Sequence, residues 1–305
     1  MTSKGPEHAL ILCRDTGKRV GDAGCLDSDL KGRNRADRCM GMPAAGRLLR
    51  MGGSGGPTNM GIDEALATLC RDVATLRFYA WEAPTLSIGY SQRSSDIDPA
   101  ACRKSTVHLV RRPTGGRAVL HQQDLTYSLI LPLRPPWTKI SIAESYHQIN
   151  VCLLRGLETL GLKVRVGSRP RQVNGALSPF CFPAISQDEV LVGRKKVIGS
   201  AQRRFPTALL QQGSILLDFD PAGILDLLRP SDRAAAAGAF ETVGSLREAL
   251  GWLPDRLEVE TAIRNGFSEE MGIEFVEGEL RPEEFRLSVE LAATRYGSED
   301  WTFRR

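Results

Sequence analysis

The sequence lacks long apolar runs, and its net charge is small. No apolar segment reaches the length of a membrane-spanning helix, and the N-terminus has no apolar stretch of the secretory type. A net charge of only +4 falls short of the clustered basic face of a nucleic-acid-binding protein. We therefore expect no nucleic-acid partner and no membrane partner. The weak positive field suits an acidic protein partner instead.

The cysteines do not form a recognisable metal or redox pattern. Seven are scattered over 305 residues without a CxxC pair, which argues against a zinc site or a redox dithiol. An odd number without an export signal indicates a reducing compartment. We therefore expect no metal, no cofactor and a cytoplasmic location. The cysteines are Cys13, Cys25, Cys39, Cys70, Cys102, Cys152 and Cys181.

The chain divides by composition near residue 46. Residues 1–46 are rich in Gly, Asp, Lys and Arg without sustained periodicity. We expect them to form a disordered extension, or to be translated upstream sequence. Residues 47–305 are predicted to form the folded domain, with no internal repeat and no low-complexity tract.

Hydrophobic periodicity predicts an α+β fold, because strands dominate first and helices dominate the end. A loop is expected at Gly52–Pro57. Helices are predicted at Asn59–Cys70, Ser141–Leu160, Ala222–Leu228, Leu246–Leu250, Leu257–Met271 and Pro282–Tyr296. Strands are predicted at Leu76–Trp81, Thr85–Gly89, Val107–Val110, Leu125–Leu131 and Leu209–Leu217.

Cys181 and two nearby lysines form the strongest candidate for covalent chemistry. A free thiol is only about 3% thiolate at pH 7, and a close ammonium raises that fraction. The segment from Asp188 to Ile198 is typical of a β-hairpin that turns at Gly193-Arg194, which brings Lys195 and Lys196 back along the chain. Adjacent strand residues face opposite ways, so only one lysine can point at a given site. The alternative is an inert buried thiol beside a solvated hairpin edge.

A glycine loop follows a predicted strand in the run Arg111–His121. Gly115 and Gly116 allow close approach of backbone N–H groups to an anion or a carbonyl, and the two preceding arginines can bind an acidic partner or a phosphate. A simple turn is the alternative. We expect His121 to order the loop through a hydrogen bond to backbone rather than to move a proton. Asp63 and Glu64 are expected on a solvated or capped helix face.

Several runs together resemble the biotin/lipoate protein ligase superfamily over residues 47–305. The runs are Asn59–Leu66, Arg111–His121, Cys181-Phe182, Gly199–Arg203 and Arg295–Trp301. Within this superfamily the chain is most similar to the cysteine-dependent octanoyltransferases of lipoate assembly. ATP-using lipoate ligases carry a third glycine where this chain has Arg117, and they lack a nucleophilic cysteine at the position of Cys181.

The resemblance implies a curved mixed β-sheet flanked by helices and a transfer reaction without ATP. Octanoyl would pass from octanoyl-acyl carrier protein to Cys181 as a thioester, and then to a lysine of a lipoyl domain such as that of the glycine cleavage H protein. Lys196 would lower the pKa of the thiol and is preferred over Lys195. Once neutral, Lys196 is also a candidate base for the acceptor lysine. The remaining candidate site residues, for substrate binding, are Arg111, Arg112, Gly115, Gly116, His121, Gly199, Ser200 and Ala201.

An octanoyl chain calls for an apolar tunnel, since burying its methylenes contributes about 5 kcal/mol at roughly 0.8 each. We expect the segments Leu86–Tyr90 and Leu125–Leu131 to line it. Backbone N–H groups at Gly115-Gly116 or Ser200-Ala201 are candidate oxyanion donors. Three alternatives stay open: an ATP-dependent lipoate–protein ligase, an amidotransferase that moves octanoyl between lipoyl domains, and an inactive acyl-binding module.

Overall fold

The computed structural model describes residues 44–135, 137–167, 189–228, 233, 237–238 and 240–305. Cys181 and nearly all of the predicted extension lie outside these residues, so both expectations stay predictions. Among the helices that the structure describes, none has the length and apolarity to cross a bilayer.

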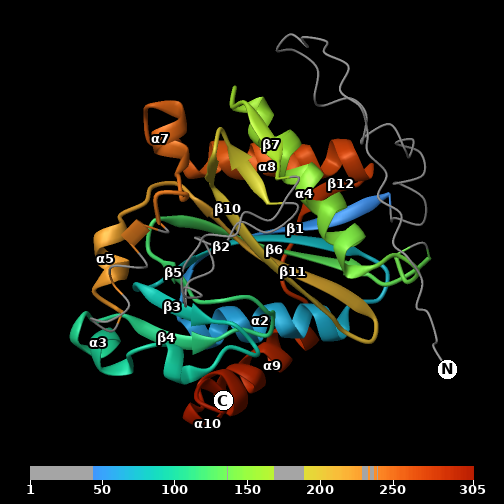
Figure 1. The fold of residues 1–305 in the computed structure, drawn as a ribbon. Helices are drawn as coiled ribbons and strands as arrows, with labels where there is room; N and C mark the ends of the chain where they lie inside the picture. The colour runs from blue at the N-terminus through green and yellow to red at the C-terminus, as the bar shows by residue number, and fades with distance from the viewer. Residues whose placement is uncertain (1–43, 136, 168–188, 229–232, 234–236, 239) are drawn as a thin grey trace, which may run out of the picture. The chain divides into compact units, whose positions relative to one another are not determined.

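A six-stranded mixed sheet forms the centre of the domain (Figure 1), in the strand order β10-β11-β6-β2-β1-β12. Strand β1 runs parallel to both β2 and β12, and the other pairs are antiparallel. This mixture confirms the predicted α+β class. The strands are β1 (Ala45–Ser54), β2 (Ala74–Trp81), β6 (Asp124–Pro132), β10 (Ile198–Arg204), β11 (Ala208–Leu216) and β12 (Glu274–Glu277).

The chain also forms two smaller sheets of three strands each, in the orders β4-β3-β5 and β7-β8-β9. Their strands are β3 (Thr85–Ile88), β4 (His108–Arg111), β5 (Val119–His121), β7 (Val164–Val166), β8 (Val190–Val192) and β9 (Lys195–Lys196).

Different helices cover the two faces of the large sheet (Figure 1). Leu48 belongs to the core completed by α4 (Ile142–Thr159) and α8 (Arg256–Met271), whereas Leu49 belongs to the core completed by α2 (Gly56–Leu69). Successive strand side chains point to opposite faces, so this alternation lets one strand serve both cores. The other helical segments are η2 (Ser94–Asp96), α3 (Pro99–Lys104), α5 (Pro221–Leu225), α7 (Leu246–Leu250), α9 (Pro282–Leu291), the π-helical η3 (Ala292–Tyr296) and α10 (Glu299–Thr302).

Local sequence signals explain where the central helices begin. The Ser141 hydroxyl accepts from the Glu144 N–H at 3.1 Å, and the Glu144 carboxylate accepts from the Ser141 N–H at 2.9 Å. This capping box starts α4 one residue inside its predicted range. The loop predicted at Gly52–Pro57 is wrong for most of its length, because β1 pairs with β2 as far as Ser54 and α2 begins at Gly56. Pro57 suits that first helical turn, where a missing N–H costs no hydrogen bond.

Strand register brings a tyrosine under the candidate site. Tyr127 of β6 lies opposite Gly213 of β11, and a Cβ at Gly213 would lie 2.2 Å from the tyrosine ring. Only glycine leaves that space for the ring. The Tyr127 hydroxyl accepts from Gln211 at 2.8 Å and is hydrogen-bonded to Ser200 Oγ at 2.8 Å.

Candidate active site

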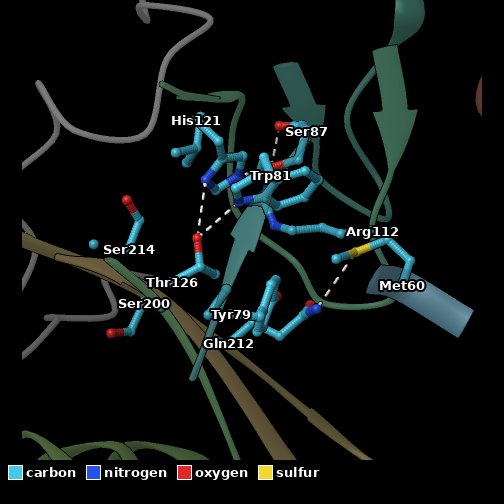
Figure 2. Close-up of a pocket in the computed structure, with 14 residues that line it drawn as sticks. Met60, Tyr79, Trp81, Ser87, Arg112, His121, Thr126, Ser200, Gln212 and Ser214 are labelled. Atoms are coloured by element: carbon cyan, nitrogen blue, oxygen red, sulfur yellow. Dashed lines mark hydrogen bonds between the residues drawn. The ribbon is translucent and has the colours of Figure 1, made fainter. Parts of the chain in front are cut away.

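A small cavity of about 30 Å³, partly open to solvent, lies where the large sheet meets the β4-β3-β5 sheet (Figure 2). The segments Leu86–Tyr90 and Leu125–Leu131 were expected to line a tunnel, and each contributes one polar residue to the cavity wall. These residues are Ser87 of β3 and Thr126 of β6. The apolar lining comes from elsewhere, from Tyr79 and Trp81 of β2 and from Met60 and Val119. The lining residues are Met60, Tyr79, Trp81, Ser87, Arg112, Val119, His121, Thr126, Gly199, Ser200, Ala201, Gln212, Gly213 and Ser214.

Arg112 holds the glycine loop in place from inside the cavity wall. Its Nη1 donates to the Ser87 carbonyl at 2.9 Å and to Ser87 Oγ at 3.1 Å, and its Nη2 donates to the carbonyls of Gly115 at 2.6 Å and Arg117 at 2.7 Å. Gly116 adopts a positive φ of 82°, which favours glycine. Arg112 therefore binds the loop itself, and its expected role toward a substrate stays a prediction.

Arg111 is not among the residues that line the cavity, and it ties the C-terminal segment to the loop that follows β3. It is fully buried, and its Nη1 donates to the carbonyls of Gly89 and Gln92, both at 2.7 Å. Its Nε donates to the Thr302 carbonyl at 3.0 Å, and Trp301 Nε1 donates back to the Arg111 carbonyl at 2.9 Å. Burial lowers the pKa of Arg111 to about 10. The structure gives this arginine a structural role, and substrate binding by it stays a prediction.

His121 makes its hydrogen bonds to side chains. Its Nδ1 lies 2.8 Å from Asp124 Oδ2, and its Nε2 lies 2.9 Å from Ser87 Oγ. The ring stacks on Trp81 with centroids 4.1 Å apart (Figure 2). The hydrogen bond that we expected from His121 to backbone is not among its contacts within the described residues. Its link to the glycine loop is indirect, through Ser87 and Arg112.

Asp124 is hydrogen-bonded to His121, and one of its carboxylate oxygens, Oδ2, makes three hydrogen bonds. Its Oδ2 also accepts from Thr126 Oγ1 at 2.8 Å and from Ser214 Oγ at 2.7 Å. Burial alone would raise the pKa of Asp124, but the attraction of His121 and the three hydrogen bonds outweigh it and hold that pKa below its usual value. The carboxyl group is therefore ionised at neutral pH.

The predicted hairpin separates the two lysines as expected. Gly193 turns it with a φ of 59°, and Lys196 lies fully buried with its Nζ 2.9 Å from Glu189 Oε1. Lys195 instead reaches Glu248 at 2.6 Å on the surface. Lys196 does not line the described cavity. Its proximity to Cys181 stays a prediction, because the cysteine lies outside the described residues.

Asp63 and Glu64 are buried and do not cap α2, so the prediction of a solvated or capped helix face is wrong. Asp63 is fully buried between α2 and the sheet, where Arg77 Nη1 donates to its Oδ1 at 2.7 Å and Gln212 Nε2 donates to its Oδ2 at 2.7 Å. Glu64 binds Arg295 and the Tyr296 hydroxyl. The signal that sequence reasoning missed is Arg77 itself, since a charge within an apolar strand calls for a buried partner.

Gln212 links this buried network to the glycine loop, and sequence reasoning also missed it. Its Oε1 accepts from Thr114 Oγ1 at 2.7 Å, while its Nε2 donates to Asp63. Hydrogen bonds from Asp63 through Gln212 to Thr114 therefore connect α2, β11 and the loop beside the cavity. A glutamine inside a predicted strand carries no pattern that reveals such a role.

The remaining predicted residues lie in or beside the cavity. Gly199, Ser200 and Ala201 line it from β10, the strand at the edge of the large sheet. Gly115 and Gly116 lie next to the wall, where a Cβ at Gly89 would lie 1.9 Å from the Gly116 carbonyl oxygen. Oxyanion binding by either pair of backbone N–H groups stays a prediction. No group of three or more His, Cys, Asp or Glu side chains among the described residues could hold a metal.

The chain belongs to the family described as the lipoyl protein ligase A/B catalytic domain, whose sequence model matches residues 56–268. One similar solved structure is a bipartite lipoate protein ligase from Thermoplasma acidophilum, which was studied together with its E2 lipoyl domain. Its TM-score is 0.73 and its sequence identity is 26%, and the match covers 85% of this chain and 96% of that chain. A second similar structure is a lipoate-protein ligase A bound with ATP, with a TM-score of 0.70 and 27% identity. The match covers 85% of this chain and 98% of that chain.

Curated relatives within this family carry a more specific name. The octanoyltransferase LipM of Kyrpidia tusciae is 40% identical over 85% of this chain and 98% of its own length. The LipM of Bacillus subtilis is 35% identical over the same shares of both chains. These relatives agree with the superfamily expected from the glycine loop and its companion motifs.

Proposed function

We propose that this protein is an acyltransferase of lipoate biosynthesis that transfers octanoyl groups to lipoyl domains. The observation that carries the proposal is the match to relatives named octanoyltransferase, which extends over 98% of their length at up to 40% identity. Met60, Trp81 and Val119 give the small cavity beside the glycine loop an apolar part, which supports contact with an apolar acyl group.

The proposed chemistry uses Cys181 as the acyl carrier. The thiolate attacks the thioester carbonyl of octanoyl-acyl carrier protein, and the pantetheine thiolate leaves, so one thioester replaces another without ATP. The acceptor lysine then attacks the enzyme thioester and forms an amide, which is downhill. The burial of Lys196 next to Glu189 supports a role as a fixed positive charge that favours the Cys181 thiolate.

The proposed partners are two acidic carrier domains in the cytoplasm, octanoyl-acyl carrier protein and a lipoyl domain such as that of the glycine cleavage H protein. The chain's net charge of +4 supports association with negatively charged domains. The T. acidophilum relative in the fold comparison was studied together with its E2 lipoyl domain.

Intact mass measurement tests the proposal directly. Purified protein is incubated with octanoyl-acyl carrier protein in the absence of ATP. We expect one added octanoyl mass, located on the Cys181 peptide, removed by hydroxylamine and absent from Cys181→Ala. A mass that persists in Cys181→Ala, or no added mass at all, would contradict the proposal.

The fold comparison supports a second candidate, an ATP-dependent lipoate–protein ligase, because one similar structure holds ATP. Arg117 at the position of the third glycine argues against it on the superfamily pattern. The same variant separates the candidates, since a ligase given ATP and free lipoate or octanoate would retain activity in Cys181→Ala. The proposed transferase would lose it.

A further inference from the structure

Two arginines from distant parts of the chain pack against the ring of Tyr90, which lies just after β3. Arg304 Cζ is 3.8 Å from the centre of the Tyr90 ring, and Arg203 Cζ is 4.6 Å from it. Arg304 Cζ also lies 4.1 Å from the centre of the Trp301 ring. All four side chains are partly exposed, and we call them the arginine surface. Packing on rings fixes a guanidinium in place and leaves N–H groups at its edge for a ligand.

Hydrogen bonds place the arginine surface next to the glycine loop. Arg203 Nη1 donates to the Pro113 carbonyl at 3.2 Å, and the Tyr90 N–H donates to the Thr114 carbonyl at 2.8 Å. Arg304 Nη2 donates to the Tyr90 carbonyl at 2.7 Å. A ligand bound by these arginines would therefore lie beside the loop that borders the cavity.

The charges of the two arginines are not neutralised by ion pairs. Among the described residues, Arg203 and Arg304 contact backbone carbonyls and aromatic rings, and neither pairs with a carboxylate. The pKa of the neighbouring Arg111 shows the same excess of positive charge. Burial lowers that pKa to about 10, and the charges of Arg304, Arg305 and Arg112 add to the effect.

Acidic side chains of the same region leave the two arginines available. Glu64 is buried and already binds Arg295. Glu299 and Asp300 are exposed in α10, but neither forms an ion pair with the arginine surface in the part of the chain that the structure describes. Guanidinium groups that are held in place without a carboxylate partner suit a ligand that brings carboxylates or a phosphate.

The two proteins of the proposed reaction bring different charges to this surface. The acceptor presents a lysine ammonium, which positive charge beside the glycine loop repels. The donor thioester is attached to its carrier protein through a phosphodiester, which the same charge attracts. The sign of the charge therefore favours the donor over the acceptor.

We propose that Arg203, Arg304 and Tyr90 form the docking surface for the acidic donor, octanoyl-acyl carrier protein; this inference rests on the proposed function. Carboxylates and the phosphodiester of the carrier bind the two guanidinium groups, which Tyr90 and Trp301 hold in place. Exposed charges at such a surface act mainly on the association rate, and salt weakens their effect. The lipoyl domain docks at a different surface.

Binding of fluorescently labelled holo-acyl carrier protein tests the proposal without any transfer, because this form carries the phosphodiester but no octanoyl group. We expect Arg203→Glu and Arg304→Glu each to slow its association with the full chain about tenfold at low ionic strength. The difference should nearly vanish toward about 1 M salt. Binding of an unmodified lipoyl domain should not weaken in parallel.

The matched control is Arg264→Glu, which makes the same change of charge in α8, on the side of the large sheet away from α10 (Figure 1). Arg264 is also partly exposed, and its hydrogen bonds go to Asn265. We expect association in this variant to stay within about twofold of the wild type, because its charge lies far from the docked carrier.

A small thioester provides a readout that a merely structural role would not mimic. Arg304→Glu should slow octanoylation from octanoyl-acyl carrier protein about tenfold more than octanoylation from octanoyl-pantetheine, which has neither carrier nor phosphate. Arg304→Lys keeps the charge and should restore most of the difference. Should Arg304→Glu not fold, Arg203→Gln and Arg304→Gln decide by the same criteria.

Three results would overturn the docking surface. They are association of the carrier at the wild-type rate in both glutamate variants, an equal or larger loss of lipoyl-domain binding, and equal losses with the two octanoyl donors. In each case octanoylation of the wild type would leave the proposed function standing. Failure of the wild type to become octanoylated by the carrier would instead refute the proposed function.

Discussion

Lys196 Nζ lies 2.9 Å from Glu189 Oε1, and both side chains are buried at the base of the β8–β9 hairpin. A buried ammonium without a counter-charge tends to lose its proton, whereas a partner carboxylate keeps it charged. The pair therefore gives Lys196 two separable roles, as half of a buried ion pair and as a source of positive charge. The proposed thiolate of Cys181 needs only the second role.

A double substitution can separate these roles. Lys196→Met removes the ammonium that pairs with the buried Glu189 carboxylate, and we expect a loss of about 3–5 kcal/mol in the free energy of unfolding. Adding Glu189→Met should restore most of that stability, because apolar pairs often replace buried ion pairs without loss. Urea denaturation measures the recovery. Octanoylation of Cys181 should stay low in the double variant, and full recovery of octanoylation with stability would contradict a chemical role for Lys196.

The buried carboxylate of Asp63 should be among the most sensitive positions outside the cavity. Asp63→Ala removes the partner of a fully buried Arg77, so we expect a loss of about 3–5 kcal/mol in unfolding free energy. Asp226→Ala is the matched control, since Asp226 pairs with Arg233 at 3.6 Å on the surface, and such pairs contribute at most about 1 kcal/mol. Urea denaturation measures both losses. If the two substitutions lowered the free energy of unfolding equally, the buried pair of Asp63 and Arg77 would not be needed for stability.

Much of the fold follows from local patterns in the sequence. The apolar strand Leu125–Leu131 and the helix that Ser141 caps were predictable, because periodicity and capping are local. Strand β12 was not, since Glu274–Glu277 has mixed polarity and exists through pairing with β1 more than 200 residues away. A pairing at that distance leaves no local signal.

The residues of the candidate site were also only partly predictable from the sequence. The Arg112 and His121 positions stood out from the glycine-loop run, but their contacts could not be predicted. Ser87 lies on a different strand from His121, and the antiparallel register of β3 with β5 brings the two strands together. Asp63 was assigned to solvent because helix periodicity says which residues share a face, but not what that face meets.

The stability of the protein should depend on pH through Asp124. Its pKa is lowered in the folded state, so the carboxylate contributes stability that is fully present above the unfolded pKa of about 3.9 and is lost as the pH falls toward the folded value. We expect the difference in unfolding free energy between wild type and Asp124→Asn to be largest near neutral pH. It should shrink from about pH 5 downward.

Denaturant titrations at a series of pH values measure that difference. Asp300→Asn is the control for the change from carboxylate to amide, because Asp300 is exposed in α10. A difference that grows as the pH falls would mean that the folded protein raises the pKa of Asp124. That outcome would also remove the ionised acceptor on which the orientation of His121 depends.

Arg111 should behave as a structural residue when it is replaced by lysine. A lysine cannot reproduce the planar fork that donates to the carbonyls of Gly89, Gln92 and Thr302, so buried acceptors lose their donors. We expect Arg111→Lys to lower the unfolding free energy by about 2 kcal/mol or more, with little change in the KM for octanoyl-acyl carrier protein. Arg247→Lys, in an exposed pair with an aspartate, is the matched control. Unchanged stability together with a raised KM would assign Arg111 to substrate binding instead.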